Sequence, residues 1–278
     1  MSILTREQFE KGRHFVYRHG DLLTRRRFAY HFEHGSKQAV LDVLACYQND
    51  DGGFGNGLEL DLLCPASSGA CTESAFGFLH ELGINDGPVL DRAIEWVLSN
   101  STDNGDVPHP IEAVMAYPHA DWWEIDAYSS SGIVPIAGLL GKMGRSVPEI
   151  SERAAKVFEQ TYIPFPEKID FYAHRPLYLY LKYADGADKY AGHLQEVEAA
   201  CVKMLEEDTS HALLLDSWDS IDIPRSLWQS KAAKAIADLQ EDGGLLVRQF
   251  AKFPWWRPLW TLDLFLTMKN KGLLENMG

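Results

Sequence analysis

Four carboxylates lie beside sequence features that are typical of ligand sites. Glu59 and Asp61 follow the glycine-rich stretch QNDDGGFGNG, and Glu124 and Asp126 follow a pair of tryptophans. Enzymes that cleave glycosidic bonds use two carboxyl groups, one as proton donor and the other as nucleophile or base. We therefore take these four acids as the candidate catalytic residues, provided that the fold brings two of them to opposite sides of a scissile bond.

Aromatic side chains are concentrated in the segments ADWWEIDAY and FAKFPWWRPLWTLD. Aromatic faces stabilise carbocations and stack on sugar rings, so we expect a small-molecule ligand that is either isoprenoid-like or a sugar. Packing in the core is the alternative role, because tryptophan is highly buried on average. The candidate ligand-binding residues are Trp122, Trp123, Tyr128, His174, Trp255, Trp256, Arg257 and Trp260.

The elements that carry these residues are expected to be helices throughout. In SKQAVLDVLACYQ, the apolar residues Val40, Val43, Leu44 and Tyr47 recur at the spacing of one helix face, and alternating strand patterns are scarce. We therefore predict an all-α protein. No apolar run is long enough for a transmembrane helix, and the charged N-terminus lacks a signal core, so we expect a cytoplasmic location.

A net charge of −14 argues against nucleic acid as a partner, because phosphate binding requires a basic surface. The cysteines lack the Cys-x-x-Cys spacing, and in a chain of this length they are expected to be reduced thiols. No Gly-x-Ser-x-Gly motif is present, which excludes a hydrolase of that kind.

An internal repeat runs through the sequence. LACYQNDDGGFG (44–55) recurs as IADLQEDGGLLV (236–247), and CTESAFGFLHELG (71–83) is matched by WTLDLFLTMKNKG (260–272), which pairs Thr72 with Thr261. A weaker copy begins at DNGDVP (103–108) and ends at Gly144, and a degenerate unit is expected around FYAHRPLYLYLKYADG. Each unit would be a helix, a glycine-rich turn and a second helix closed by a glycine, and such hairpins must pack on their neighbours to bury their apolar faces.

The motif YQNDDGGFG resembles the Gln-aspartate-glycine-glycine-aromatic repeat of terpenoid cyclases and protein prenyltransferase β subunits. The resemblance is close over 44–83, partial over 236–272 and thin elsewhere. It implies that residues 1–278 form a single α/α toroid domain of about five to six stacked helical hairpins around a central cavity. The glycine-rich stretch itself is interpreted as a structural turn, because it lacks the Gly-Lys-Ser/Thr of a phosphate loop.

The sequence departs from this family where the chemistry would lie. The Asp-x-Asp-Asp motif of the cyclases is absent, and DSWDSID (216–222) is the nearest acidic cluster. The prenyltransferases bind zinc through an Asp and a Cys one residue apart and a distant His; here Asp61 and Cys64 have a different spacing, with His109, His119 or His174 as the third ligand such a site would need. We therefore expect neither a metal nor another cofactor.

Three functions remain open on the sequence. The leading hypothesis is a prenyltransferase- or cyclase-like protein that binds an apolar or isoprenoid-like ligand in an aromatic-lined central cavity. The second is an α/α-toroid carbohydrate-active enzyme that uses paired carboxylates. The third is a non-catalytic toroid that binds a protein partner, which the two missing motifs favour.

Overall fold

The computed structural model describes the chain over residues 4–125, 132–163, 171–207, 221–246 and 251–274. Over these ranges its regular structure consists of eleven α-helices and three short 3-10 helices, with isolated bridges in place of a sheet, which confirms the prediction of an all-α protein. None of the described helices is long and apolar enough to cross a membrane. In chain order the α-helices are α1 (Arg6–His19), α2 (Leu22–Phe32), α3 (Lys37–Ala45), α4 (Gly69–Glu81), α5 (Pro88–Ser99), α6 (Ile133–Lys142), α7 (Pro148–Tyr162), α8 (Phe171–Tyr183), α9 (Ala191–Glu206), α10 (Arg225–Ala237) and α11 (Trp256–Asn270).

The helices are grouped in two compact units. Unit 1 consists of Met1–Val43 and Ala200–Gly278 and contains α1, α2, α10 and α11; unit 2 is Leu44–Ala199 and contains α4 to α8. Helices α3 and α9 each cross the boundary between the two.

Local sequence signals determine where several helices begin. Thr5 and Gln8 form a reciprocal capping box at the start of α1, and the hydroxyl of Ser68 accepts the N–H of Cys71 at the start of α4. Pro88 and Pro148 occupy the first turn of α5 and α7, where their fixed φ suits the helix and the missing N–H has no partner to lose.

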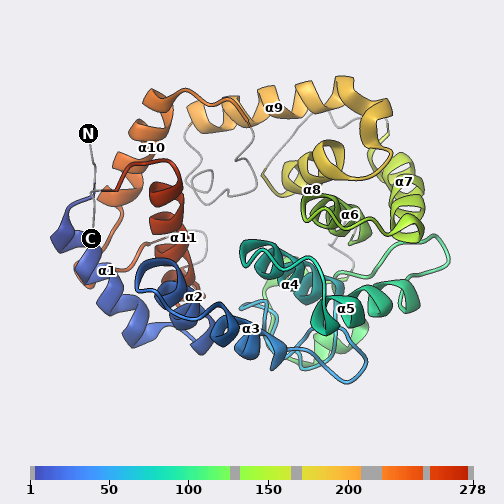
Figure 1. Ribbon diagram of the computed structural model, residues 1–278, viewed down its shortest axis with the longest axis horizontal. Helices are drawn as coiled ribbons and strands as arrows, with labels where there is room; N and C mark the ends of the chain where they lie inside the picture. Colours follow the sequence, from blue (N-terminus) through green and yellow to red (C-terminus); the bar gives the residue numbers. More distant parts are fainter. Residues whose placement is uncertain (1–3, 126–131, 164–170, 208–220, 247–250, 275–278) are drawn as a thin grey trace. The chain divides into compact units, whose positions relative to one another are not determined.

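Unit 2 has two layers of helices. Helix α6 packs against α4 on one side and α8 on the other, whereas α5 and α7 pack against each other and against α4 and α6 respectively (Figure 1). The sequence explains this division, because every residue from 133 to 140 of α6 is buried, whereas α5 and α7 bury one face and expose the other. Helix α6 is therefore buried between α4 and α8 in the layer that carries the candidate site.

Two glycines let α6 approach the backbone of α8. A Cβ atom placed on Gly138 would lie 2.4 Å from the carbonyl carbon of Leu179, and one on Gly141 would lie 1.8 Å from the carbonyl oxygen of Tyr183. Moving toward the C-terminus of α6 thus also moves toward the C-terminus of α8, so the two helices run parallel. Their N-terminal ends consequently lie at the same end of the layer.

The first glycine-rich turn has the geometry expected of a structural joint. Gly52 adopts φ +94°, its N–H donates to the carbonyl of Asn49 (3.0 Å), and the N–H of Gly53 donates to Oδ1 of Asp51 (3.0 Å). The amide of Gln48 donates to the carbonyl of Gly52 and to a carbonyl of α5. Gly53 has an ordinary φ, but a Cβ there would lie 2.6 Å from atoms of the Ser67 and Trp96 side chains. A glycine is therefore required at this position by close packing.

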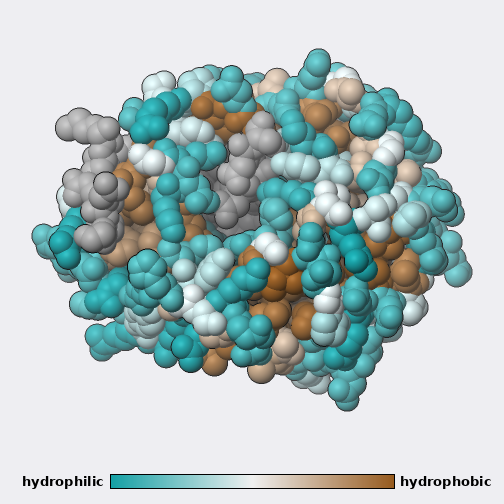
Figure 2. Space-filling view, viewed as in Figure 1, coloured by the Kyte–Doolittle hydropathy of each residue, from teal (hydrophilic) through white to brown (hydrophobic). Residues whose placement is uncertain are grey.

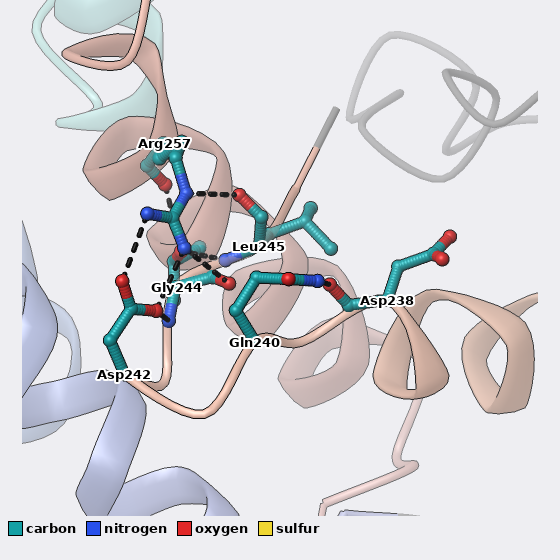
Figure 3. A network of polar contacts seen from close by, with 7 residues as sticks. Asp238, Gln240, Asp242, Gly244, Leu245 and Arg257 are labelled. Carbon is teal, nitrogen blue, oxygen red and sulfur yellow. Dashed lines mark hydrogen bonds and ion pairs between the residues drawn. The ribbon is translucent and has the colours of Figure 1, made fainter. Parts of the chain in front are cut away.

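The last turn, in unit 1, repeats this geometry with a different clamp. Gly243 adopts φ +89°, and the N–H of Gly244 donates to Oδ1 of Asp242 (2.9 Å). The guanidinium of Arg257 donates to both carboxylate oxygens of Asp242 and to the carbonyls of Gly244 and Leu245 (Figure 3). In the first turn the equivalent carboxylate instead accepts the indole N–H of an α5 tryptophan at 3.2 Å.

The threonines that the repeat matched have the same function in both copies. The N–H of Phe54 donates to the hydroxyl of Thr72 (3.1 Å), and the N–H of Leu245 donates to the hydroxyl of Thr261 (2.8 Å). Each bond joins the end of a turn to the second helix of its hairpin. The closing glycines Gly83, Gly144 and Gly272 have φ of +61°, +71° and +64°, which confirms them as helix-ending positions.

The weaker third copy is also a turn of this kind. The N–H of Thr102 donates to the carbonyl of Asp106 (2.7 Å), Gly105 adopts φ +96°, and the N–H of Asp106 donates to the side chain of Asn104 (3.0 Å). Asp106 therefore stands where the first and last copies have their second glycine.

Phenylalanines and a glycine form the core of unit 1. The ring of Phe9 on α1 lies 5.8 Å from that of Phe28 on α2 and 5.1 Å from that of Phe265 on α11. A Cβ on Gly12 would lie 2.4 Å from the ring of Phe265, so the glycine allows α1 and α11 to pack closely.

Candidate functional site

The candidate site in unit 2 is built on two loops that follow glycine-rich turns. The first, residues 55–68, leads into α4, and the second, residues 107–132, leads into α6. The main chain joins them: the N–H of Ala120 donates to the carbonyl of Asp61 (2.9 Å), the N–H of Leu63 donates to the carbonyl of Pro118 (3.0 Å), and Leu62 forms a bridge with His119. The two loops thus hold each other at the N-terminal ends of α4 and α6.

Asp106 closes the base of the second loop. Its Oδ1 accepts the N–H groups of Val107 (2.8 Å), Gly132 (3.0 Å) and Ile133 (3.0 Å), so one carboxylate binds both ends of the loop. It also satisfies free N–H groups at the start of α6, where an acid is electrostatically favoured.

Asp61 and Trp123 meet across these loops. The indole N–H of Trp123 donates to Oδ1 of Asp61 at 2.7 Å, and both side chains are buried. The ring of Trp123 lies edge-on to that of His109, with 6.4 Å between centroids. Two of the predicted site residues, one catalytic and one ligand-binding, are therefore in direct contact.

Glu59 lies beside this pair and is held by α4. The hydroxyl of Ser74 donates to its Oε2 at 3.1 Å, and the side chain is only partly exposed. The pKa of Glu59 is raised to about 8, chiefly by burial and by the charge of Asp61, with a smaller contribution from Glu73; the Ser74 hydrogen bond and the charge of Arg175 act in the opposite direction. Glu59 is consequently protonated at neutral pH.

Glu73 on α4 is a member of the site that sequence reasoning missed. Nε2 of His109 lies 2.8 Å from its Oε2, and the guanidinium of Arg175 on α8 donates to its Oε1. Burial acts to raise the pKa of Glu73, but the charge of Arg175 and the contact with His109 outweigh it and lower the pKa to about 2. One signal was available in the sequence, since Glu73 is the only charged residue in the first two turns of α4.

The imidazole of His109 sits in a slot made by two glycines. A Cβ on Gly69, the first residue of α4, or on Gly132, which precedes α6, would come within 3.1 Å of its Cδ2 atom. The N–H of Gly69 also donates to the carbonyl of Pro108 (3.0 Å). The starts of both helices thus fix the position of this ring.

The other predicted residues of unit 2 lie around this cluster. Glu124 is exposed and its carboxylate pairs with Nε2 of His119 at 3.2 Å, whereas His174 is fully buried in the first turn of α8. Trp122 is exposed, next to the buried Trp123. Asp126 and Tyr128 lie outside the described residues.

Exposed apolar side chains are frequent on the same two loops. The seven large hydrophobic residues exposed in the described chain include four on them, namely Leu63, Tyr117, Trp122 and Ile125. The face of the molecule drawn in Figure 2 is mostly hydrophilic, with hydrophobic residues gathered in small areas. Exposed apolar residues on loops that also carry buried acids are typical of a ligand site.

The predicted residues of the second tryptophan segment belong to unit 1. The rings of Trp256 and Trp260 stack at 5.1 Å and are buried, while Trp255 is exposed and lies edge-on to Phe253. Arg257 clamps the last turn, as described above, and its guanidinium covers the ring of Phe15 at 4.6 Å.

No metal site emerges from the described residues. They contain no group of three or more His, Cys, Asp or Glu side chains placed to hold a metal ion, and Asp61 accepts an indole N–H. Cys64 and Cys71 are both buried, and burial raises the pKa of Cys71 to about 12.

The arrangement can carry out acid–base chemistry. Its environment moves the pKa values of two carboxyl groups, Glu59 and Glu73, in opposite directions, so that one is an acid and the other an anion at neutral pH. A third carboxyl, Asp61, is held by a tryptophan that belongs to the facing loop.

Comparison of the chain with models of protein families, with curated proteins and with solved structures finds no match.

Proposed function

We propose that this protein is an acid–base enzyme in which Glu59 donates a proton and Asp61 is the paired carboxylate. The observation that carries the proposal is the state of Glu59, since its raised pKa gives it a proton to donate at neutral pH. Asp61 is two residues away, and its carboxylate is oriented by Trp123, so that it is fixed with respect to the donor. Trp122 and Tyr117, exposed on the facing loop, provide aromatic surfaces for the ligand.

The acid strength of Glu59 favours a carbohydrate over an isoprenoid as the substrate. Protonation of an alkene requires a strong acid, whereas a carboxyl with a pKa of about 8 is weaker than an ordinary glutamic acid. Such a group is suited to protonate the leaving oxygen of a glycosidic bond, as the raised acids of glycosidases do. Sugar rings also stack on exposed aromatic side chains. We therefore propose a glycoside-cleaving reaction.

An apolar ligand is the second candidate, and it corresponds to the prenyltransferase- or cyclase-like hypothesis. The specific observation in its favour is the exposure of Leu63, Tyr117, Trp122 and Ile125 on the two loops of the candidate site. In this case the residues would bind an isoprenoid chain, and the α/α toroid would provide its central cavity. The acids would then have no catalytic part in the reaction.

The experiment that tests the first candidate is a set of oligosaccharides and aryl glycosides incubated with the wild type, Glu59→Gln and Asp61→Asn. We expect release of reducing ends or aryl alcohol by the wild type and at least a hundredfold loss in each variant. Glu152→Gln, which changes an exposed acid of α7, is the matched control and should retain full activity.

Binding distinguishes the two candidates. If no glycoside is cleaved, and tryptophan fluorescence changes on addition of farnesol but not of oligosaccharides, the carbohydrate proposal is wrong. Trp122→Ala should then abolish the fluorescence response. No response to either ligand class would favour the non-catalytic protein-binding hypothesis.

A further inference from the structure

Glu73 is joined to Asp61 by a series of side-chain contacts. Oε2 of Glu73 on α4 lies 2.8 Å from Nε2 of His109, and the ring of His109 lies edge-on to that of Trp123, with 6.4 Å between centroids. The indole N–H of Trp123 donates to Oδ1 of Asp61 at 2.7 Å. The other carboxylate oxygen of Glu73 accepts the guanidinium of Arg175 on α8. This contact series connects Asp61 to two helices to which it does not belong.

The main chain leaves the orientation of the Trp123 indole open. The N–H of Ala120 donates to the carbonyl of Asp61 (2.9 Å), and the N–H of Trp123 donates to the carbonyl of Ala120 (2.9 Å). These bonds place the two backbones, but a tryptophan side chain can adopt several staggered rotamers on a fixed backbone. The rotamer in which the indole meets Asp61 must be selected by side-chain packing, and the ring of His109 packs against this indole.

His109 can select this rotamer because its own ring is held along one edge. A Cβ placed on Gly69 or Gly132 would come within 3.1 Å of its Cδ2 atom, and the adjacent ring atom, Nε2, faces Glu73. The two glycines leave a slot for the ring, and the carboxylate fixes its direction within the slot. Arg175 holds the carboxylate in turn, and a buried charge of this kind is costly unless it is paired.

We propose that Glu73 is a positioning residue for the carboxylate of Asp61. It fixes the imidazole of His109, and the imidazole keeps the indole of Trp123 in the orientation that binds Asp61. The proposal rests on the assignment of Asp61 as the paired carboxylate of the proposed reaction. Because a displacement of about 1 Å in a reacting group lowers a rate about a hundredfold, loss of this support should slow the reaction although Glu73 transfers no proton itself.

The test without substrate is hydrogen exchange of the indole N–H groups, measured by NMR at one pH on protein labelled with nitrogen-15 in its tryptophans. Trp123→Phe and Trp96→Phe identify two of the signals by their loss. The buried Trp96, whose indole donates to Oδ2 of Asp51 at 3.2 Å in the same unit, is the internal control. Glu73→Met keeps the length of the side chain and removes its contact with His109.

We expect Glu73→Met to speed exchange at Trp123 by about tenfold or more and to leave exchange at Trp96 unchanged. If Glu73 acts through His109, the double variant Glu73→Met/His109→Ala should exchange no faster at Trp123 than His109→Ala alone. Unchanged exchange at Trp123, equal acceleration at both tryptophans, or additive effects in the double variant would overturn the proposal.

A second variant keeps the test decisive if Glu73→Met does not fold by circular dichroism. Glu73→Met/Arg175→Met removes the same contact with His109 and leaves no unpaired cation behind. The same exchange pattern is expected of it.

Kinetics provide the arm with substrate. On a glycoside that the wild type cleaves, Glu73→Met should lower kcat about tenfold and leave KM unchanged, because the aromatic surfaces that bind the ligand lie outside the contact series. An unchanged kcat would overturn the positioning role. Selective exchange at Trp123 without any glycosidase activity would refute the proposed function and leave the contact series intact, whereas glycosidase activity with unmoved exchange would do the reverse.

Discussion

Replacing Glu59 by glutamine should stabilise the protein at alkaline pH. The glutamine keeps an oxygen that can accept the Ser74 hydroxyl, but it cannot ionise in a partly buried position beside Asp61 and Glu73. The folded-state pKa of Glu59 is raised from 4.5 to about 8, so between these values the folded chain keeps a proton that the unfolded chain has released. The free energy of unfolding of the wild type must therefore fall as pH rises through this window.

The size of the effect follows from the shift. A difference of one in pKa is equivalent to about 1.4 kcal/mol of folding free energy. The change from 4.5 to about 8 therefore sets a ceiling of about 5 kcal/mol on the stability that is lost. Because Glu59 is only partly buried and solvent screens its charge, we expect about 2–3 kcal/mol. Glu59→Gln should show no such loss, so its advantage over the wild type should grow from near zero at pH 4.5 to its full value above pH 8.

The assay is urea unfolding of the wild type and Glu59→Gln at pH 5, 7 and 9, monitored by circular dichroism. Glu152→Gln provides the control, and its difference from the wild type should not depend on pH. A difference between Glu59→Gln and the wild type that is the same at pH 5 and pH 9 would refute the reasoning, because it would show that Glu59 titrates alike in the folded and unfolded chain.

Four further substitutions test the fold, each by urea unfolding. Gly141→Ala places a Cβ 1.8 Å from the Tyr183 carbonyl oxygen and should lower the free energy of unfolding by about 3 kcal/mol or more. Gly77→Ala in α4 is the matched control: a Cβ there meets no atom of another element within 4 Å, so the substitution should stabilise the protein by about 0.5–1 kcal/mol. Equal effects of the two substitutions would contradict the packing of α6 on α8. Arg257→Met removes the clamp of the last turn and should cost about 1–2 kcal/mol, and a neutral result would show that the turn holds without it. Asp106→Ala should cost about 1–2 kcal/mol and speed proteolysis within residues 107–132; an unchanged cleavage rate would show that the carboxylate does not close the loop.

Local features of the fold could be predicted because they depend on neighbours in the chain. The turn at Gly52 is formed by residues within a few positions of it, and the turn at Gly243 recurs because the same residue types recur there. The bonds to Thr72 and Thr261 follow as well, since the repeat places both threonines at matching positions of their hairpins. Gly144, which ends the weaker third copy of the repeat, has the positive φ expected of a residue that ends a helix.

The contacts of the candidate site could not be predicted in the same way. Glu59 and Asp61 were chosen for their position after a turn, but Asp61 is bound by Trp123, which is far away in the sequence. Arg257 was chosen as a ligand-binding residue because it lies among tryptophans in the sequence. In the structure its guanidinium instead donates to the carboxylate of Asp242. No local pattern indicates which distant partner a polar side chain will meet.

The sequence by itself determined the helices, the repeated turns and the segments that carry the acids, because hydrophobic periodicity and glycine conformations act over a few residues. Only the tertiary structure decided that the loops after two of these turns meet, that Glu73 and Arg175 pair, and that Glu59 is partly buried within reach of the charges of Asp61 and Glu73. The protonation states of the acids are set by desolvation and by charges from other helices, and these exist only once the chain has folded.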